Sequence, residues 1–263
     1  MESIVNLTLI ELKKVLNKRN ILIWMAIVLL LPFIQFMFVK DGYEYYKPIE
    51  VFHEVFSSFI PVLFPVIVVA IFLPHFFQEQ RHNYMTYVRM RCSINRYLLS
   101  KAVINGFLAG TVCFSMMFIP FLIIEYVVPL THIVHFSKLL PGEDGPGYPT
   151  FTQFLAYGSF VYGFVYSLWV AINALVYATI GYYLLLILPN PYVALSVPFL
   201  FYHGFNFITG NLYLEVFSPI STIFPFNITM QPLWTVTIPF FFLVAAVALL
   251  GIYAHRHIEK LVL

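Results

Sequence analysis

Six long apolar runs dominate this sequence of 263 residues, and they constrain its fold more than any motif does. Apolar residues make up 61% of the chain and charged residues only 10%, and a water-soluble fold of this size could not bury so much apolar surface. A helix of about 20 apolar residues crosses a bilayer core of about 30 Å. The runs predict six transmembrane helices, at about 21–39, 55–77, 102–124, 154–188, 192–208 and 236–255.

The predicted fold class is an all-α membrane protein that forms one transmembrane domain over residues 1–263. The second run, 55–77, contains three prolines. Each proline frees a backbone carbonyl, which needs a partner within the protein because lipid offers none. In the third run Gly106 and Gly110 form a GxxxG pair, a spacing that permits close approach of two helices.

Lysine and arginine placement predicts the orientation. Most of the 14 basic residues lie before the first run, in the loop after the second run and in the C-terminal tail. Short loops rich in Lys and Arg stay on the cytoplasmic side, so we expect both termini in the cytoplasm of a multi-pass plasma-membrane protein. The small net charge of +2 favours anionic membrane lipid over nucleic acid as the partner of these residues.

Residues 1–20 have the pattern of an amphipathic helix. Apolar residues recur at helical spacing on one face, with polar residues on the other. The apolar positions are Val5, Leu9, Leu12 and Leu16, and the polar positions are Glu11, Lys14, Asn17 and Lys18. This pattern is typical of a helix that lies in the headgroup plane; the alternative is a plain extension of the first transmembrane helix.

Two segments on the predicted outer side are too interrupted to cross a membrane. Residues 125–153 are polar and rich in Pro and Gly, which indicates an irregular external loop. Residues 209–235 contain Pro219, Pro225 and Pro232 with apolar residues between them and no Lys or Arg. We expect an external re-entrant or surface-lying element there, before the last helix.

Catalytic and metal motifs do not emerge from the sequence. A phosphate-binding GxxxxGK[ST] loop is absent, so we expect no ATPase activity in this chain. His53 and Glu54 begin an HExxH-like string, but Ser57 stands where a zinc site needs the second histidine. The two cysteines, Cys92 and Cys113, indicate neither a disulfide framework nor a thiolate metal site.

Polar side chains inside the predicted helices form a second set of candidates, because such groups are costly in lipid and often line a pathway. No charged residue lies near the middle of a predicted span. The amides and the histidine serve either as a substrate path or as hydrogen bonds between helices. The candidate path residues are Gln35, Asn105, Asn173, His203 and Asn206.

The predicted cytoplasmic loop at 78–101 combines basic and aromatic residues. If residues 80–92 are helical, Tyr84, Tyr87, Val88 and Arg91 share one face by their three-and-four spacing. Such a ridge suits a groove on a soluble protein. A solvated basic loop that only fixes the topology is the alternative.

The order of these parts resembles the membrane subunit of type-2 ATP-binding cassette (ABC) exporters. That family has an amphipathic N-terminal helix, six spans, a basic coupling region after the second span and an external apolar element before the last. The coupling region commonly runs acid, small residue, Thr, apolar pair, Pro, Arg and closing Lys. Glu79, Val88, Arg96 and Lys101 match this pattern, whereas Asn83, Tyr84 and Cys92 stand where Gly, Thr and Pro are frequent. The run PNPYVALSVPFL, 189–200, also resembles the start of the family's fifth span.

The resemblance implies a permease without a cofactor of its own. In that family two membrane subunits pair, and two separate ATPase subunits, which bind ATP and Mg²⁺, each hold one coupling region. Compact, aromatic-rich members resemble exporters of antimicrobial peptides and permeases for antibiotic or bacteriocin immunity, with lipids and small toxic compounds as further cargo classes. The expected coupling residues are Glu79, Tyr84, Tyr87, Val88, Arg89, Arg91 and Arg96.

Two other classes compete with this interpretation. An ATP-independent carrier or channel would move its cargo without any partner. A membrane-embedded enzyme would need acids or histidines that converge at one headgroup layer, and the sequence shows no such convergence.

Overall fold

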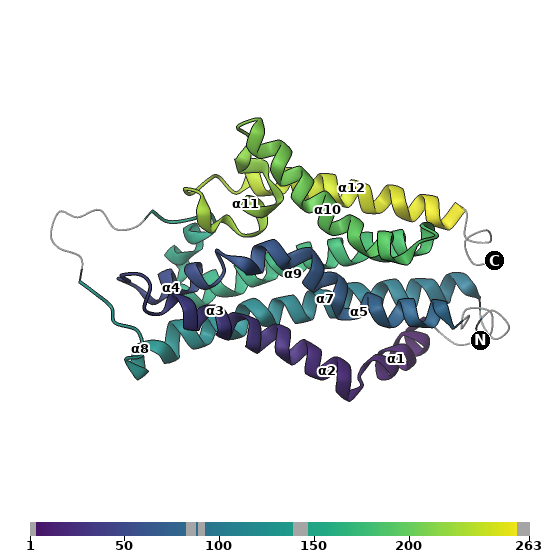
Figure 1. Ribbon diagram of the computed structural model, residues 1–263, viewed down its shortest axis with the longest axis horizontal. Coiled ribbons are helices and arrows are strands. Elements are labelled where there is room, and N and C mark those ends of the chain that lie inside the picture. Colours follow the sequence, from purple (N-terminus) through teal and green to yellow (C-terminus); the bar gives the residue numbers. More distant parts are fainter. Residues whose placement is uncertain (1–3, 83–87, 89–92, 139–146, 257–263) are drawn as a thin grey trace.

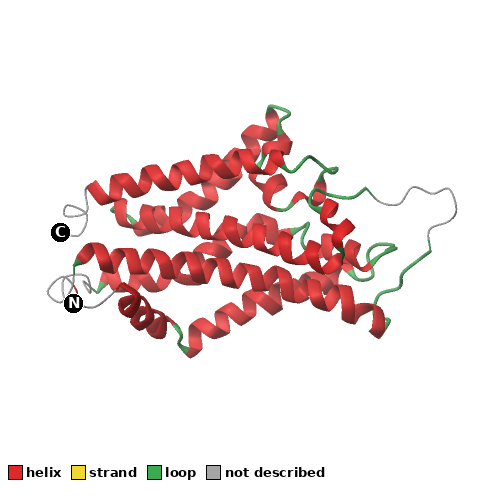
Figure 2. Cartoon of the chain, turned by 180° about the vertical axis from the view of Figure 1, so that it is seen from behind, coloured by secondary structure: helices red, strands yellow, loops and turns green. Residues whose placement is uncertain are grey.

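The computed structural model describes residues 4–82, 88, 93–138 and 147–256, and every regular element within them is helical (Figure 1; Figure 2). Tyr45 and Phe136 form an isolated β-bridge. The elements are α1 (Ile4–Val15), α2 (Lys18–Met25), the π-helical turn η1 (Ala26–Leu30), α3 (Leu31–Val39), α4 (Pro48–Val55), α5 (Phe59–Arg81), α7 (Ile94–Leu122), the π-helical turn η2 (Ile123–Val127), α8 (Val128–Thr131), the 3₁₀ helix η3 (Thr152–Tyr157), α9 (Ser159–Ile187), α10 (Pro191–Asn211), the 3₁₀ helix η4 (Glu215–Phe217), α11 (Pro219–Ile223), the 3₁₀ helix η5 (Pro225–Asn227) and α12 (Trp234–Arg256).

Six helices within the described ranges are long and apolar enough to cross a membrane, as the sequence predicted. Two of them are composite: the first joins α2, η1 and α3, and the third joins α7, η2 and α8. The six run over Lys18–Val39, Phe59–Arg81, Ile94–Thr131, Ser159–Ile187, Pro191–Asn211 and Trp234–Arg256. The chain therefore has the architecture of a multi-pass membrane protein.

Three of these helices form the centre of the bundle. In α5, α7 and α9, between 50% and 61% of the most apolar stretch is buried, against 22% in each of the first, fifth and sixth spans. The outer spans therefore leave most of their apolar surface for contact with lipid or with another protein.

The most extensive contact between two helices is that of α7 with α9, and glycines of α7 lie in it. A Cβ atom at Gly106 would lie 3.1 Å from Cγ of Leu175, and one at Gly110 would lie 3.5 Å from the carbonyl oxygen of Ala171. The GxxxG pair therefore faces α9. On α9 itself, a Cβ at Gly163 would overlap the ring of Phe121.

The bundle has two different ends (Figure 1). One end, here called the terminal end, holds α1, the last turn of α12, the end of α5 and the start of α7. The opposite end, here called the far end, holds α4, α8 and α11. An even number of spans returns the chain to the end where it began.

The segment between α10 and α12 caps the far end. It is built of η4, α11 and η5, which are too short to cross a membrane. Tyr166 donates a hydrogen bond to the carbonyl of Ile223 at 2.9 Å, and Trp169 donates one to the carbonyl of Thr222 at 2.8 Å. These bonds satisfy carbonyls that an irregular segment cannot pair within itself.

Several helices extend beyond the predicted apolar runs. Residues 78–81 complete α5 and residues 94–101 begin α7, so the link between these helices is shorter than the predicted loop. Residues 125–131 belong to η2 and α8 rather than to a loop. Gly158, with φ of +105°, separates η3 from α9, a conformation that favours glycine.

The N-terminal helix is a separate element. The chain breaks after α1, and Asn17 caps α2 by accepting a hydrogen bond from the backbone N–H of Asn20 at 2.9 Å. This break excludes a continuous extension of the first span. Val5 and Leu9 are exposed, as expected for a lipid-facing side, but Glu11 lies buried on the side that packs against α7.

Gly163→Ala should destabilise the protein by about 1–3 kcal/mol, because the added methyl group must displace the Phe121 ring. Gly204→Ala on α10 is the matched control, since a Cβ there would meet no described atom within 4 Å. Unfolding in mixed detergent micelles by titration with sodium dodecyl sulfate measures both. Equal free energies of unfolding for the two variants would contradict this packing.

Candidate functional site

A group of four charged side chains, of which Lys101 and Glu11 are buried, lies at the terminal end, and we call it the ion cluster. Nζ of Lys101 on α7 is 2.5 Å from Oε2 of Glu11 on α1 and 2.5 Å from Oε2 of Glu79 on α5. Nζ of Lys14 is 2.5 Å from the other carboxylate oxygen of Glu11. Two acids and two bases therefore join three separate helices.

The positions of Glu79 and Lys101 in their helices bring both side chains to the same depth at the terminal end. Glu79 stands in the last turn of α5, and Lys101 stands about two turns into α7, which starts after the N-cap Ser93. Because α5 and α7 are antiparallel neighbours, the end of one lies beside the start of the other. The Glu79–Lys101 pair therefore closes the base of the link between the two helices.

Aromatic rings enclose the ammonium group of Lys101. Its Nζ lies 5.3 Å from the centroid of the Tyr97 ring and 5.9 Å from that of Phe72, within the range of cation–π attraction. The Tyr97 hydroxyl donates to Oε2 of Glu79 at 3.2 Å. Tyr182 on α9 donates to the carbonyl of Leu98 at 2.8 Å, which ties this part of α7 to α9.

Because the cluster is largely buried, the stability of the protein depends on each buried charge having a partner of opposite sign. The Lys101 side chain is 0% exposed, Glu11 6% and Glu79 13%. Removing one partner from a buried ion pair typically destabilises by about 3–5 kcal/mol, because the other charge remains without compensation. Loss of Lys101 would therefore leave the carboxylates of Glu11 and Glu79, on two other helices, without this partner.

The pKa of Glu11 reflects two opposed effects. Burial raises the pKa of this carboxyl group, but the positive charges of Lys101 and Lys14 and their hydrogen bonds outweigh burial, so its pKa lies below the usual 4.5. Glu11 therefore stays ionised when the cluster is assembled at neutral pH.

The coupling residues named from the sequence fall partly within the described chain. Glu79 belongs to the ion cluster, Arg96 is half-buried in the first turn of α7, and Val88 is partly buried against the hydrophobic core. Whether the proposed ridge shares one face stays a prediction. Tyr84, Tyr87, Arg89 and Arg91 lie outside the described residues.

The candidate path residues are dispersed over four spans. Asn105 donates to the carbonyl of Ala178 at 2.8 Å and so links α7 to α9. His203 on α10 pairs with the carbonyl of Val62 at 2.9 Å, and Asn206 accepts from the backbone N–H of Ile220 at 2.9 Å. These three side chains form hydrogen bonds between elements, which agrees with the second role predicted for them, that of linking helices.

The other two candidates show no common path. Asn173 donates to the carbonyl of Trp169 on its own helix at 3.0 Å, and Gln35 is buried on α3. Among the described residues that line the apolar groove between the first and third spans, none is one of the five candidates. The structure does not bring the five together.

His53 lies in the packed far end of the bundle. Its Nε2 is 3.0 Å from the hydroxyl of Tyr162, and its ring stacks on Phe226 at 5.0 Å. Burial lowers the pKa of His53 to about 3. The described residues contain no group of three His, Cys, Asp or Glu side chains that could hold a metal ion.

Sequence reasoning missed the burial of Lys101 and Glu11. Lys101 precedes the apolar run at 102–124 and belongs to the predicted loop, while Glu11 belongs to the predicted polar face of the N-terminal helix. The sequence does contain a signal for the Glu79–Lys101 pair, because Glu79 closely follows the second apolar run and Lys101 directly precedes the third. Opposite charges at the two ends of one link can form an ion pair when the helices pack antiparallel.

Comparison with known proteins gives no further support: no family model, curated protein or solved structure matches the chain.

Glu11→Gln should lower the free energy of unfolding at pH 7, and the deficit should shrink in acid. Because the folded pKa is depressed, the stabilisation by ionised Glu11 is fully present above about 4.5 and is lost as the pH falls through the folded value. Thermal unfolding of both proteins from pH 7 to pH 3 checks this. A deficit that is constant across this range would show that Glu11 acts only by packing.

Proposed function

We propose that this chain is the membrane subunit of an ATP-driven exporter of the type-2 ABC kind. The main support is the ion cluster, which connects the ends of α5 and α7, on either side of their link, to α1. A partner protein that binds this link and moves it would therefore displace three helices together. In such a mechanism the chain changes conformation and catalyses no reaction itself.

Contacts between helices would transmit a movement of the link into the bundle. Lys101 lies on α7, and α7 contacts α9 through Tyr182 and through the glycine face around Gly106. Gln80 on α5 lies 3.5 Å from the carbonyl of Leu185, next to the turn between α9 and α10. The central helices α5, α7 and α9 would thus move together when the link is displaced.

The topology of this proposal follows from charge placement. The terminal end carries the described basic residues Lys13, Lys18, Arg19, Arg81 and Arg96, which favours a cytoplasmic location for this end and for both chain termini. In that orientation the cap formed by η4, α11 and η5 lies at the external side and acts as the re-entrant element before the last span. The membrane is the bacterial plasma membrane.

A second copy of the chain, or a related permease, is the proposed membrane partner. The span α10 is the least apolar of the six, and only 22% of its most apolar stretch is buried. It carries the half-exposed His203, and polar groups at membrane depth usually face protein or a water-filled cavity. A homodimer would cover this face, and a hydrophobic or amphipathic cargo such as a peptide, antibiotic or lipid would pass between the copies.

The energy source in this proposal is a separate ATPase subunit that binds ATP and Mg²⁺ and docks on Tyr84, Tyr87, Val88 and Arg91, with support from Arg89 and Arg96. An ATP-independent carrier or channel is the alternative. That class predicts gradient-driven transport by the purified chain in liposomes that contain no ATPase.

The double variant Tyr87→Asp/Val88→Asp should release the ATPase, because two carboxylates would replace the apolar part of the ridge. Affinity purification of the tagged chain from membranes of its native host, in a mild detergent, measures the amount of ABC ATPase retained by mass spectrometry. We expect a loss of at least about tenfold, which is about 1.4 kcal/mol of docking energy.

Tyr43→Asp is the matched control. Tyr43 is an exposed aromatic residue at the far end, so its replacement should leave the ATPase bound. Size-exclusion chromatography establishes that each variant is folded. Equal retention by the double variant and the wild type, or no ABC ATPase with any of them, would count against the proposal.

A further inference from the structure

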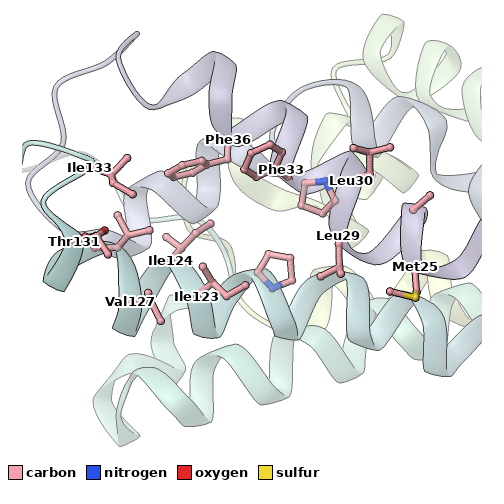
Figure 3. Close-up of a pocket in the computed structure, with 14 residues that line it drawn as sticks. Met25, Leu29, Leu30, Phe33, Phe36, Ile123, Ile124, Val127, Thr131 and Ile133 are labelled. Atoms are coloured by element: carbon pink, nitrogen blue, oxygen red, sulfur yellow. The ribbon is translucent and has the colours of Figure 1, made fainter. Parts of the chain in front are cut away.

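An apolar groove lies between the first and third spans (Figure 3). Its volume is about 580 Å³, within the range of small-molecule pockets. One wall comes from α2, η1 and α3, and the other from α7, η2 and α8. The described residues that line it are all apolar except Thr131, whose hydroxyl is bonded to the carbonyl of Val128 at 3.0 Å.

Two π-helical turns face this groove, and each has the same cause. The turn η1 ends two residues before Pro32, and η2 ends two residues before Pro129. A proline ring clashes with the carbonyl four residues earlier, and the wider π turn moves that carbonyl away. Leu31 and Val128 accordingly donate to the carbonyls five residues back, those of Ala26 and Ile123.

The π turns form part of both walls. Ala26, Leu29 and Leu30 of η1 and Ile123 and Val127 of η2 line the groove. Figure 3 labels Leu29 and Leu30 on one wall and Ile123 and Val127 on the other. Single π turns of this type occur often at functional sites. Two of them on opposite sides of one apolar groove distinguish this surface from an ordinary lipid-facing helix pair.

The groove has the length of one membrane leaflet. Its first wall extends from Met25 to Phe36, which at 1.5 Å per residue is about 16 Å. Half of a hydrocarbon core is about 15 Å. The mouth opens sideways, since Leu30 and Phe33 are more than half exposed, and both spans place it among acyl chains.

The rim at the far end supplies a positive charge and polar groups. Lys40 follows α3, one turn beyond the lining residue Phe36, and its Nζ lies 3.4 Å from the mostly exposed carboxylate of Asp41. His132 is exposed and stands between the lining residues Thr131 and Ile133. An apolar floor with a polar, hydrogen-bonding rim complements a molecule with a hydrocarbon chain and a polar phosphate head.

The geometry points to one phospholipid of the far-end leaflet as the occupant of this groove. One acyl chain lies along η1 and η2, and its phosphate is level with Lys40 and His132. This inference does not depend on the proposed transport function, because it concerns a lipid that is retained by the folded chain.

Photo-crosslinking tests the inference in liposomes that contain only this chain. The probe is a phosphatidylglycerol with a diazirine on one acyl chain, diluted in unlabelled phosphatidylethanolamine and phosphatidylglycerol. After irradiation, peptide mass spectrometry maps the labelled residues. We expect enrichment at Leu29, Leu30 and Val127 over Phe241 and Phe242 of α12, although these two residues are more exposed.

Val127→Trp should reduce labelling of the η1 wall about tenfold, the affinity that about two buried methylene contacts provide. Ala26→Trp on the opposite wall should act in the same way and serves if Val127→Trp does not fold. The control is Tyr126→Trp, because Tyr126 is as exposed as its neighbour Val127 but does not line the groove.

Three outcomes would overturn the inference. Uniform labelling of all exposed apolar faces would mean ordinary contact with bulk lipid. Undiminished labelling of η1 in both groove variants would place the lipid elsewhere. Failure to label the groove, together with disulfide crosslinks between chains that carry Leu29→Cys, would assign this surface to a second copy of the protein.

Discussion

The buried charge of Lys101 is the constraint on which the terminal end of this protein depends. An ammonium group in an apolar interior is strongly unfavourable unless it is paired, and here Glu11 and Glu79 pair with it from two other helices. Lys101 is the member that links all three helices, because Glu11 and Glu79 both pair with it. The requirement for pairing positions α1 across the base of the α5–α7 link and makes the three helices one mechanical unit.

The two ends of the bundle are stabilised by different kinds of interaction. The core of the far end is packed with aromatic rings: the centroid of the Phe52 ring lies 5.3 Å from that of Phe121 and 6.0 Å from that of Phe226, edge to face. Such contacts and the hydrogen bonds from Tyr166 and Trp169 hold the short helices of the cap in place. Ion pairs between helices therefore dominate at the terminal end, and aromatic packing dominates at the far end.

The number of spans was predictable from sequence because apolar length alone decides whether a helix can cross a bilayer. The ion cluster was not, because Glu11 and Lys101 are far apart in the sequence and periodicity contains no information on which helices meet. Lys101 illustrates the reason. Its position next to an apolar run predicts a residue at the membrane boundary, and only the packing of α1 against α7 buries it. The π turns depend likewise on how Pro32 and Pro129 fit their helices, which hydrophobic pattern does not reveal.

A double-mutant cycle on Glu79 and Lys101 tests the central claim most directly. The free energy of unfolding is measured by titration with sodium dodecyl sulfate for the wild type, Glu79→Gln, Lys101→Met and the combined variant. If the buried pair joins α5 to α7, the two substitutions are coupled, and the coupling free energy should be about 1–3 kcal/mol. Additive effects, with a coupling within about 0.5 kcal/mol of zero, would contradict the account.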